Sequence, residues 1–163
     1  MGLFSQETIE QEKEFGEIIP FAANIYNCEV IEVKVVQTED TNWDSGQPVR
    51  VPDTLVDQVQ VVFDVQSTFD GSPVTSPDGK DPTFTSLSLW FSPVKTGMSK
   101  KGPSRARQFI TTVMDWKIND PINLAILEDL IVNKKLIGKK LRLNISVTDK
   151  NKNKIDGFLA IKK

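Results

Sequence analysis

The chain of 163 residues contains no histidine and only one cysteine. Without histidine it can form neither a Ser-His-Asp nor a Cys-His catalytic pair, and it has no imidazole ligand for zinc. Cys28 alone can make neither an intramolecular disulfide nor a thiolate zinc cluster, so a reducing, intracellular home is the default expectation. We therefore expect a protein that is not an enzyme and that holds no cofactor and no metal.

Long hydrophobic runs are absent as well. No apolar stretch approaches the ~20 residues that cross a bilayer. The first residues lead into acidic ones and do not resemble a secretory signal. Hydrophobic residues still make up 39% of the sequence, which is ordinary for a globular protein. These features predict a soluble, cytoplasmic domain without a membrane partner.

The two halves of the chain carry opposite charge. Residues 1–94 contain 4 Lys/Arg and 16 Asp/Glu, whereas residues 95–163 contain 16 Lys/Arg and 6 Asp/Glu. The net charges of −12 and +10 nearly cancel in the whole chain, at −2. Such polarity favours either halves that attract each other or a basic face for a polyanion. Charges mixed over the surface remain an equal alternative, because the halves of a small barrel interleave.

Patterning predicts one domain over residues 20–163, preceded by an acidic segment over residues 1–19. A change of apolar parity near Val30 predicts a bulge in the first strand. Helical spacing and a capping Ser104 predict the first of two helices. The expected strands cover residues 23–38, 55–67, 84–94, 140–148 and 154–161, and the expected helices cover residues 105–115 and 123–132.

Two polar stretches, residues 39–54 and 70–82, are interpreted as loops from their Asn, Asp, Gly and Pro content. The predicted order is three strands, two helices and two strands. This is the order of the OB barrel. The predicted fold class is therefore mostly β, an OB-like five-stranded barrel with a helical insert between strands 3 and 4.

Three segments of the sequence are typical of one family: Tyr26–Val33, Leu136–Leu143 and Lys154–Leu159. Through them the chain resembles the phage-encoded single-stranded-DNA-binding-like proteins with an OB fold. The resemblance covers roughly residues 20–160 and implies non-catalytic DNA binding in phage replication or recombination, inside the host cell. Replication or recombination proteins are then candidate partners. An acidic tail is common in that family at the C-terminus, whereas here the acidic residues lie at the N-terminus; this departure does not favour a partner contact made through such a tail.

A site for single-stranded nucleic acid needs cations for phosphates and aromatic faces for bases. Trp43, in a polar stretch without apolar neighbours, and Trp90, on the strand face opposite Leu87 and Leu89, are the candidate stacking residues. Trp43 could equally be a lid over the barrel mouth, and the helix could equally cover Trp90. Each basic candidate could be a solvated surface charge. The basic candidates are Lys95, Lys100, Lys101, Arg105 and Arg107, then Lys139, Lys140 and Arg142, and finally Lys150, Lys152 and Lys154.

The sequence thus predicts a protein that binds single-stranded DNA with little sequence preference. A structural or protein-interaction module, such as a virion or assembly component without nucleic-acid binding, is the first alternative, and the acidic pI of about 5.3 favours it. An enzyme that uses acidic loops and a divalent metal is the second. Neither the preference for DNA over RNA nor the existence of a homo-oligomer follows from the sequence.

Overall fold

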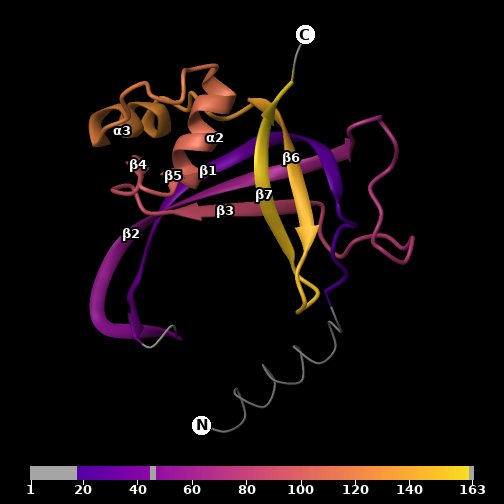
Figure 1. Cartoon of the computed structure of the whole chain (residues 1–163), viewed down its shortest axis with the longest axis horizontal. Coiled ribbons are helices and arrows are strands. Elements are labelled where there is room, and N and C mark those ends of the chain that lie inside the picture. The colour runs from indigo at the N-terminus through magenta and orange to yellow at the C-terminus, as the bar shows by residue number, and fades with distance from the viewer. Residues whose placement is uncertain (1–17, 45–46, 162–163) are drawn as a thin grey trace, which may run out of the picture.

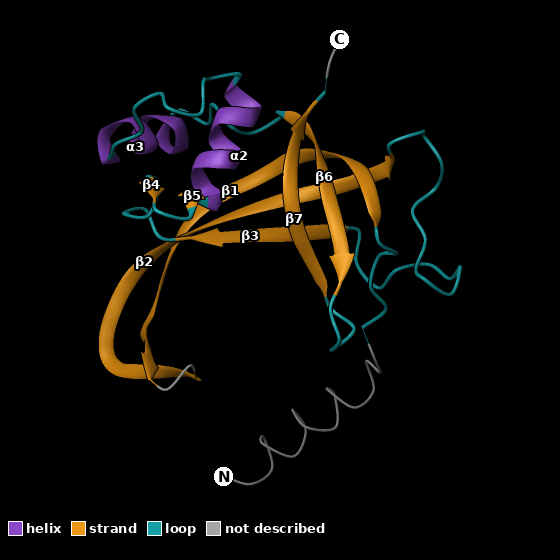
Figure 2. Cartoon of the chain, in the orientation of Figure 1, coloured by secondary structure: helices purple, strands orange, loops and turns teal. Residues whose placement is uncertain are grey.

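The computed structural model describes residues 18–44 and 47–161, and for residues 39–54 it describes the backbone only (Figure 1). Nearly all of the predicted acidic segment therefore lies outside the described residues. The described part is mostly β, as predicted (Figure 2). Its strands are β1 (Asn24–Asp44), β2 (Gln47–Thr68), β3 (Ser86–Phe91), β4 (Met98–Ser99), β5 (Gly102–Pro103), β6 (Lys140–Val147) and β7 (Asn153–Ala160), and its helices are α2 (Arg105–Met114) and α3 (Leu124–Val132).

The five longer strands form one antiparallel sheet in the order β3-β2-β1-β6-β7. Both helices lie between β3 and β6 in the chain, which confirms the predicted position of the helical insert. The sheet curls so that β6 and β7 cross over its other strands (Figure 1).

The edge strands β3 and β7 do not pair with each other in the described part of the chain, so the sheet is open. The prediction of a closed barrel is wrong in this respect. Side chains from both edge strands and from the start of α2 line the seam between them. A cleft therefore lies where a closed barrel would have a ladder of hydrogen bonds between β3 and β7.

A bulge bends β1 where the sequence predicts it. The register with β2 shifts between Val30 and Glu32, leaving Ile31 as an extra residue on β1. Before the bulge, β1 also pairs with β6; at the bulge, the Val30 N–H donates to the Lys139 carbonyl and the Gly138 N–H donates to the Val30 carbonyl. Gly138 has a φ of 86°, a conformation that glycine adopts without strain. The bend lets one strand serve two parts of the curled sheet.

Residues 39–54, predicted as a loop, are strand instead. β1 and β2 continue as a two-stranded ribbon in which Asp40 pairs with Val51 and Asp44 with Gln47. We call residues 36–44 and 47–58 the arm; no third strand pairs with it, and it curves away from the rest of the sheet (Figure 1). The loop prediction failed because a ribbon that packs on no core does not need alternating apolar residues.

The core lies between the inner face of the sheet and α2. Phe63 of β2 is fully buried and meets Phe109 of α2 edge to face, with ring centroids 5.4 Å apart. Phe109 also contacts Phe158 of β7, so α2 packs across the curl of the sheet. Alternate residues of the strands predicted over 55–67, 84–94 and 140–148 face the core and are buried: Val59, Val61, Phe63, Val65, Leu89, Phe91, Leu141, Leu143 and Ile145.

Candidate nucleic-acid interface

A cleft of about 300 Å³ lies at the seam between β3, the start of α2 and the start of β7. We call it the seam cleft. Three predicted site residues, Trp90, Arg105 and Lys154, line it from three separate elements. Its remaining lining residues are Leu87, Ser88, Leu89, Asn153 and Ile155. The fold thus brings together an aromatic ring and two cations that lie far apart in the sequence.

The alternation along β3 leaves Trp90 on the exposed face of the strand. Leu89 and Phe91 point into the core, whereas 48% of the Trp90 surface is exposed. Trp90 pairs with Gln60 on β2, whose amide nitrogen donates to the Ser88 hydroxyl over 3.1 Å. An indole that is half exposed beside polar neighbours offers a face on which a base can stack.

Arg105 and Lys154 supply the positive charge of the seam cleft. Arg105 is the first residue of α2, directly after Ser104, whose hydroxyl caps the helix by accepting from the Arg107 amide over 3.2 Å. Lys154 lies on β7 opposite Ser146 of β6. Both side chains are exposed, and neither takes part in an ion pair with a described residue. They are therefore available to an anionic ligand such as a phosphate.

Arg107, another predicted phosphate ligand, is buried instead. Only 6% of its surface is exposed. Its Nε donates to the Thr96 carbonyl over 2.9 Å, and its Nη1 donates to the carbonyls of Ile118 and Asp120 over 2.9 and 2.5 Å. The guanidinium fastens two loops to α2 and does not face solvent. The sequence does indicate the burial of Arg107. It precedes the buried Ile110 and Thr111 by three and four residues, a spacing that places the three side chains on one face of the helix.

Three of the predicted basic residues lie shortly before α2 in the sequence. Lys95 precedes β4, and Lys100 and Lys101 form the turn between β4 and β5, so all three come shortly before Arg105. All three are exposed. The Ser104 amide donates to the Gly97 carbonyl over 3.0 Å and closes this hairpin onto the helix start. The hairpin thus carries exposed cations just before α2 in the chain, but none of the three lines the seam cleft.

The other basic candidates fall at opposite ends of β6. Lys139 and Lys140 mark its start, whereas Lys150 and Lys152 follow its end in the turn to β7 (Figure 1). Eight residues of strand separate these ends by about 26 Å. Only the turn carrying Lys150 and Lys152 adjoins Lys154 and the seam cleft, so the predicted basic residues do not form one surface.

Arg142 is half-buried on β6 and has a partner within the sheet. Its Nε donates to the Asn27 side-chain oxygen over 3.0 Å, across the β1–β6 pair. The guanidinium is thereby oriented along the sheet. The structure does not bring Arg142 into the lining of the seam cleft.

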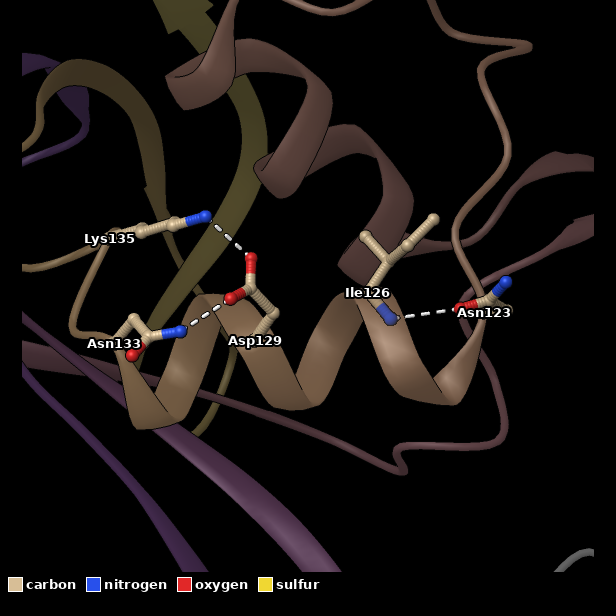
Figure 3. A network of polar contacts seen from close by, with 5 residues as sticks. All are labelled: Asn123, Ile126, Asp129, Asn133 and Lys135. Atoms are coloured by element: carbon tan, nitrogen blue, oxygen red, sulfur yellow. Dashed lines mark hydrogen bonds and ion pairs between the residues drawn. The ribbon is translucent and has the colours of Figure 1, made fainter.

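The polar contacts at the two ends of α3, drawn in Figure 3, involve no residue that lines the seam cleft. Asp129 accepts from Lys135 Nζ over 2.6 Å and from the Asn133 side-chain amide. These hydrogen bonds, with the one from Lys135 foremost, lower the pKa of the Asp129 carboxyl. At the other end of α3, the Asn123 side chain accepts from the Ile126 amide over 2.8 Å and caps the helix. Lys135 is thus engaged within the chain.

Two further polar residues line the cleft although nothing in the sequence identifies them as site residues. Ser88 is an exposed polar position on β3, and Asn153 is the first residue of β7. The Asn153 side chain accepts from the Phe21 amide over 2.8 Å and donates to the Phe21 carbonyl over 2.9 Å. This contact spans 132 positions of the chain, so no local pattern predicts it.

Trp43 lies on β1 opposite Pro48 in the arm, and its side chain lies outside the described residues.

Cys28 lies in the core and not at the cleft. Its side chain is 1% exposed. Burial, with a smaller contribution from Asp64, raises the pKa of the Cys28 thiol to about 12. Because the nucleophile in cysteine chemistry is the thiolate, this thiol is inert at neutral pH.

The described residues point to no second kind of site. Among the side chains that the structure describes, those of residues 18–38 and 55–161, no three Cys, Asp or Glu are grouped so that they could hold a metal ion. The helices in that part are too short and too polar to span a membrane. Comparisons with models of protein families, with curated proteins and with solved structures find no match to this chain.

Proposed function

We propose that the protein binds single-stranded DNA with little sequence preference, without catalysis, in replication or recombination of the phage type. The observation that carries this proposal is the meeting of Trp90, Arg105 and Lys154 around one cleft. Stacking on an aromatic side chain is sequence-tolerant, because every base has a π-face, and cations track the phosphates. An open cleft between two edge strands lets a strand enter from the side.

The order of the strands supports an OB-like identity for the curled sheet. In OB folds, the face of strands 2 and 3 and the loops between strands 1 and 2 and between strands 4 and 5 bind oligonucleotides. Here Trp90 lies on the third long strand, the arm with Trp43 joins the first two, and Lys150 and Lys152 lie between the last two. Four of the predicted residues thus fall on the expected elements.

In the proposed complex, a base stacks on Trp90 while the flanking phosphates meet Arg105 and Lys154. Lys100 and Lys101 continue the cationic track on the α2 side, and the turn before β7 continues it on the other. The Gln60 and Ser88 side chains border the ring and offer polar contacts to a base edge. None of these groups reads a defined sequence, because a single stacking position tolerates any base.

Tryptophan fluorescence on titration with poly(dT) tests the proposal. We expect quenching, and we expect Trp90→Ala to weaken binding by about 5- to 150-fold, corresponding to ~1–3 kcal/mol for one stacked base. Trp43→Ala, measured alongside, reports whether the arm contributes a second stacking position. Unquenched fluorescence at low salt, together with no shift of a labelled oligonucleotide, would contradict DNA binding.

A matched pair of double variants distinguishes DNA binding at the seam cleft from non-specific electrostatic attraction to the whole protein. Arg105→Gln with Lys154→Gln, and Lys139→Gln with Lys140→Gln, each remove two positive charges from exposed positions. We expect the first pair to weaken poly(dT) binding several-fold more than the second, since only the first lines the cleft. Equal losses would show that overall charge, and not the seam cleft, governs binding.

A protein-interaction or assembly module remains the second candidate function. The specific observation in its favour is the arm, a two-stranded ribbon that pairs with no other strand of the described chain. The oligonucleotide shift at low salt discriminates the two candidates, because an assembly module without a nucleic-acid site leaves the probe unbound.

A further inference from the structure

One edge of β1 has no partner over most of its length. β6 pairs with β1 only from Asn24 to Glu29, and the last contact on this side is made by Val30. From Ile31 to Asp44, the backbone groups that point away from β2 meet no strand in the described part of the chain. Unpaired edge groups of this kind are a template for another strand.

The two edges of the arm differ in a way that points to β1. The β2 edge carries Pro48 and Pro52, which lack an N–H, and its residues 52–54 are extra residues at the register shift between Glu39 and Asp40. Prolines and bulges are devices by which proteins block edge pairing. From Glu32 to Asp44, β1 contains no proline, no glycine and no extra residue. The β2 edge is therefore blocked, while the β1 edge remains competent to pair.

We propose that the β1 edges of two copies of this chain pair antiparallel about a two-fold axis and form a homodimer. A two-fold axis makes one edge complementary to itself, so a single unblocked edge is satisfied by a second copy. The isolated ribbon is marginally stable in water, and pairing turns the two arms into a four-stranded sheet. The pairing supplies about one backbone hydrogen bond per residue over the shared length.

Apolar surface near the root of the arm adds to the proposed interface. Ile31 and Val35 are exposed by 45% and 52%, although both are β-branched residues of a strand. Antiparallel pairing places side chains of the two copies about 5 Å apart across the interface, so both aliphatic side chains become partly buried against residues of the second copy. The proposal does not rest on nucleic-acid binding at the seam cleft, which lies on β3, α2 and β7.

Charge selects the register of the dimer. In a symmetric antiparallel pair, the residue on the axis faces its own copy. An axis at Gln37 places Lys34 opposite Asp40 of the second copy, whereas an axis at Val36 would place Glu32 opposite that aspartate. Like charges directly opposite each other destabilise a strand pair, and opposite charges stabilise it. We therefore place the axis at Gln37.

The molar mass of the full chain in solution, measured by sedimentation equilibrium without nucleic acid, is the first test. We expect a dimer that dissociates on dilution. In a shortened variant, an Asn-Gly turn replaces residues 40–54 and joins Glu39 to its ladder partner Leu55. We expect this variant to keep the near-UV circular dichroism of the core and to dimerise on the order of 100-fold more weakly. A monomeric full chain, or an unchanged dimer in the folded shortened variant, overturns the proposal.

Disulfide trapping tests the assigned edge and register. Gln37→Cys should cross-link spontaneously under mild oxidation, because directly opposed residues have Cα atoms about 4.5–5.5 Å apart, within reach of a disulfide. Gln58→Cys is the matched control, since Gln58 lies at the same level of the arm on β2, opposite Val36. The native Cys28 is buried and does not interfere. Equal cross-linking at both positions, or cross-linking only at Gln58, overturns the assignment to β1.

Discussion

At the scale of single residues, Arg107 shows how one buried cation can organise a basic surface that it does not join. Its guanidinium donates to carbonyls of Thr96, Ile118 and Asp120, in the two loops that flank α2. The first of these loops leads into the hairpin that carries Lys100 and Lys101. The position of those exposed lysines therefore depends on a side chain that solvent barely reaches.

We expect Arg107→Met to lower the free energy of unfolding by about 3 kcal/mol, because one buried and two partly buried carbonyls lose their donor. Urea denaturation followed by circular dichroism measures the change. Arg105→Met, an exposed neighbour on the same helix, is the control and should change stability by less than about 0.5 kcal/mol. Equal effects of the two substitutions would refute the role given to Arg107.

The Cys28 thiol gives the fold a sensitivity to alkaline pH. An unfolded thiol ionises near pH 9, whereas the folded one keeps its proton up to about pH 12. Between these values the folded state binds more protons, so stability is fully present below pH 9 and falls by about 1.4 kcal/mol per pH unit above it. Denaturant midpoints measured across this window should show the decline.

Cys28→Ala is the control for this decline and should make it shallower. Part of the slope should persist, because burial also raises the pKa of the neighbouring Tyr26, with a smaller contribution from Cys28 itself. A slope identical in the two proteins would show that the thiol is not its source. The variant also loses some packing in the core, which lowers stability at every pH and leaves the slope as the informative quantity.

At the scale of elements, α3 depends on its caps, because it has no acidic residue in its first turn and no basic residue in its last. We expect Asn123→Ala to cost about 1 kcal/mol, since the Ile126 amide loses its acceptor. Asn123→Asp keeps an acceptor at the same place and should restore most of the loss. Thermal unfolding of the three proteins decides the matter.

The elements that the sequence predicts correctly are those that bury one face. Alternation at Val59 to Val65 and at Leu141 to Ile145, and the capping Ser104, identify strands and a helix because each packs on the core. The arm follows no such rule: its two strands pair through the backbone, and the polar composition around Asp40 and Asp44 indicates a loop. The open seam was equally invisible, because hydrogen bonding between β3 and β7 depends on how far the sheet curls.

The candidate site was predictable in part for the same reason. Parity on β3 identifies Trp90 as outward, and the start of a capped helix identifies Arg105 as exposed. Which lysines gather around Trp90 depends on the path of β6, which sends Lys139 and Lys150 to opposite ends of the sheet. Long-range contacts such as the one between Asn153 and Phe21 leave no trace in local spacing.

At the scale of the whole molecule, binding to a polyanion must overcome a net charge of −2. We expect poly(dT) affinity to fall linearly with salt on logarithmic axes, with a slope of about −0.7 for each phosphate contacted. Arg105→Gln with Lys154→Gln should reduce the slope by about 1.4, because two contacts are lost. Titrations at several salt concentrations measure it, and an affinity that is flat with salt would contradict an electrostatic interface.

The unbonded seam has a mechanical consequence. In a barrel closed by a ladder, separating the end strands breaks a row of hydrogen bonds, whereas between β3 and β7 only side chains are in the way. The distance between β3 and β7 can therefore change with the bound ligand while all hydrogen bonds between the paired strands are kept. A cleft whose width adjusts in this way accommodates a flexible ligand better than a rigid one.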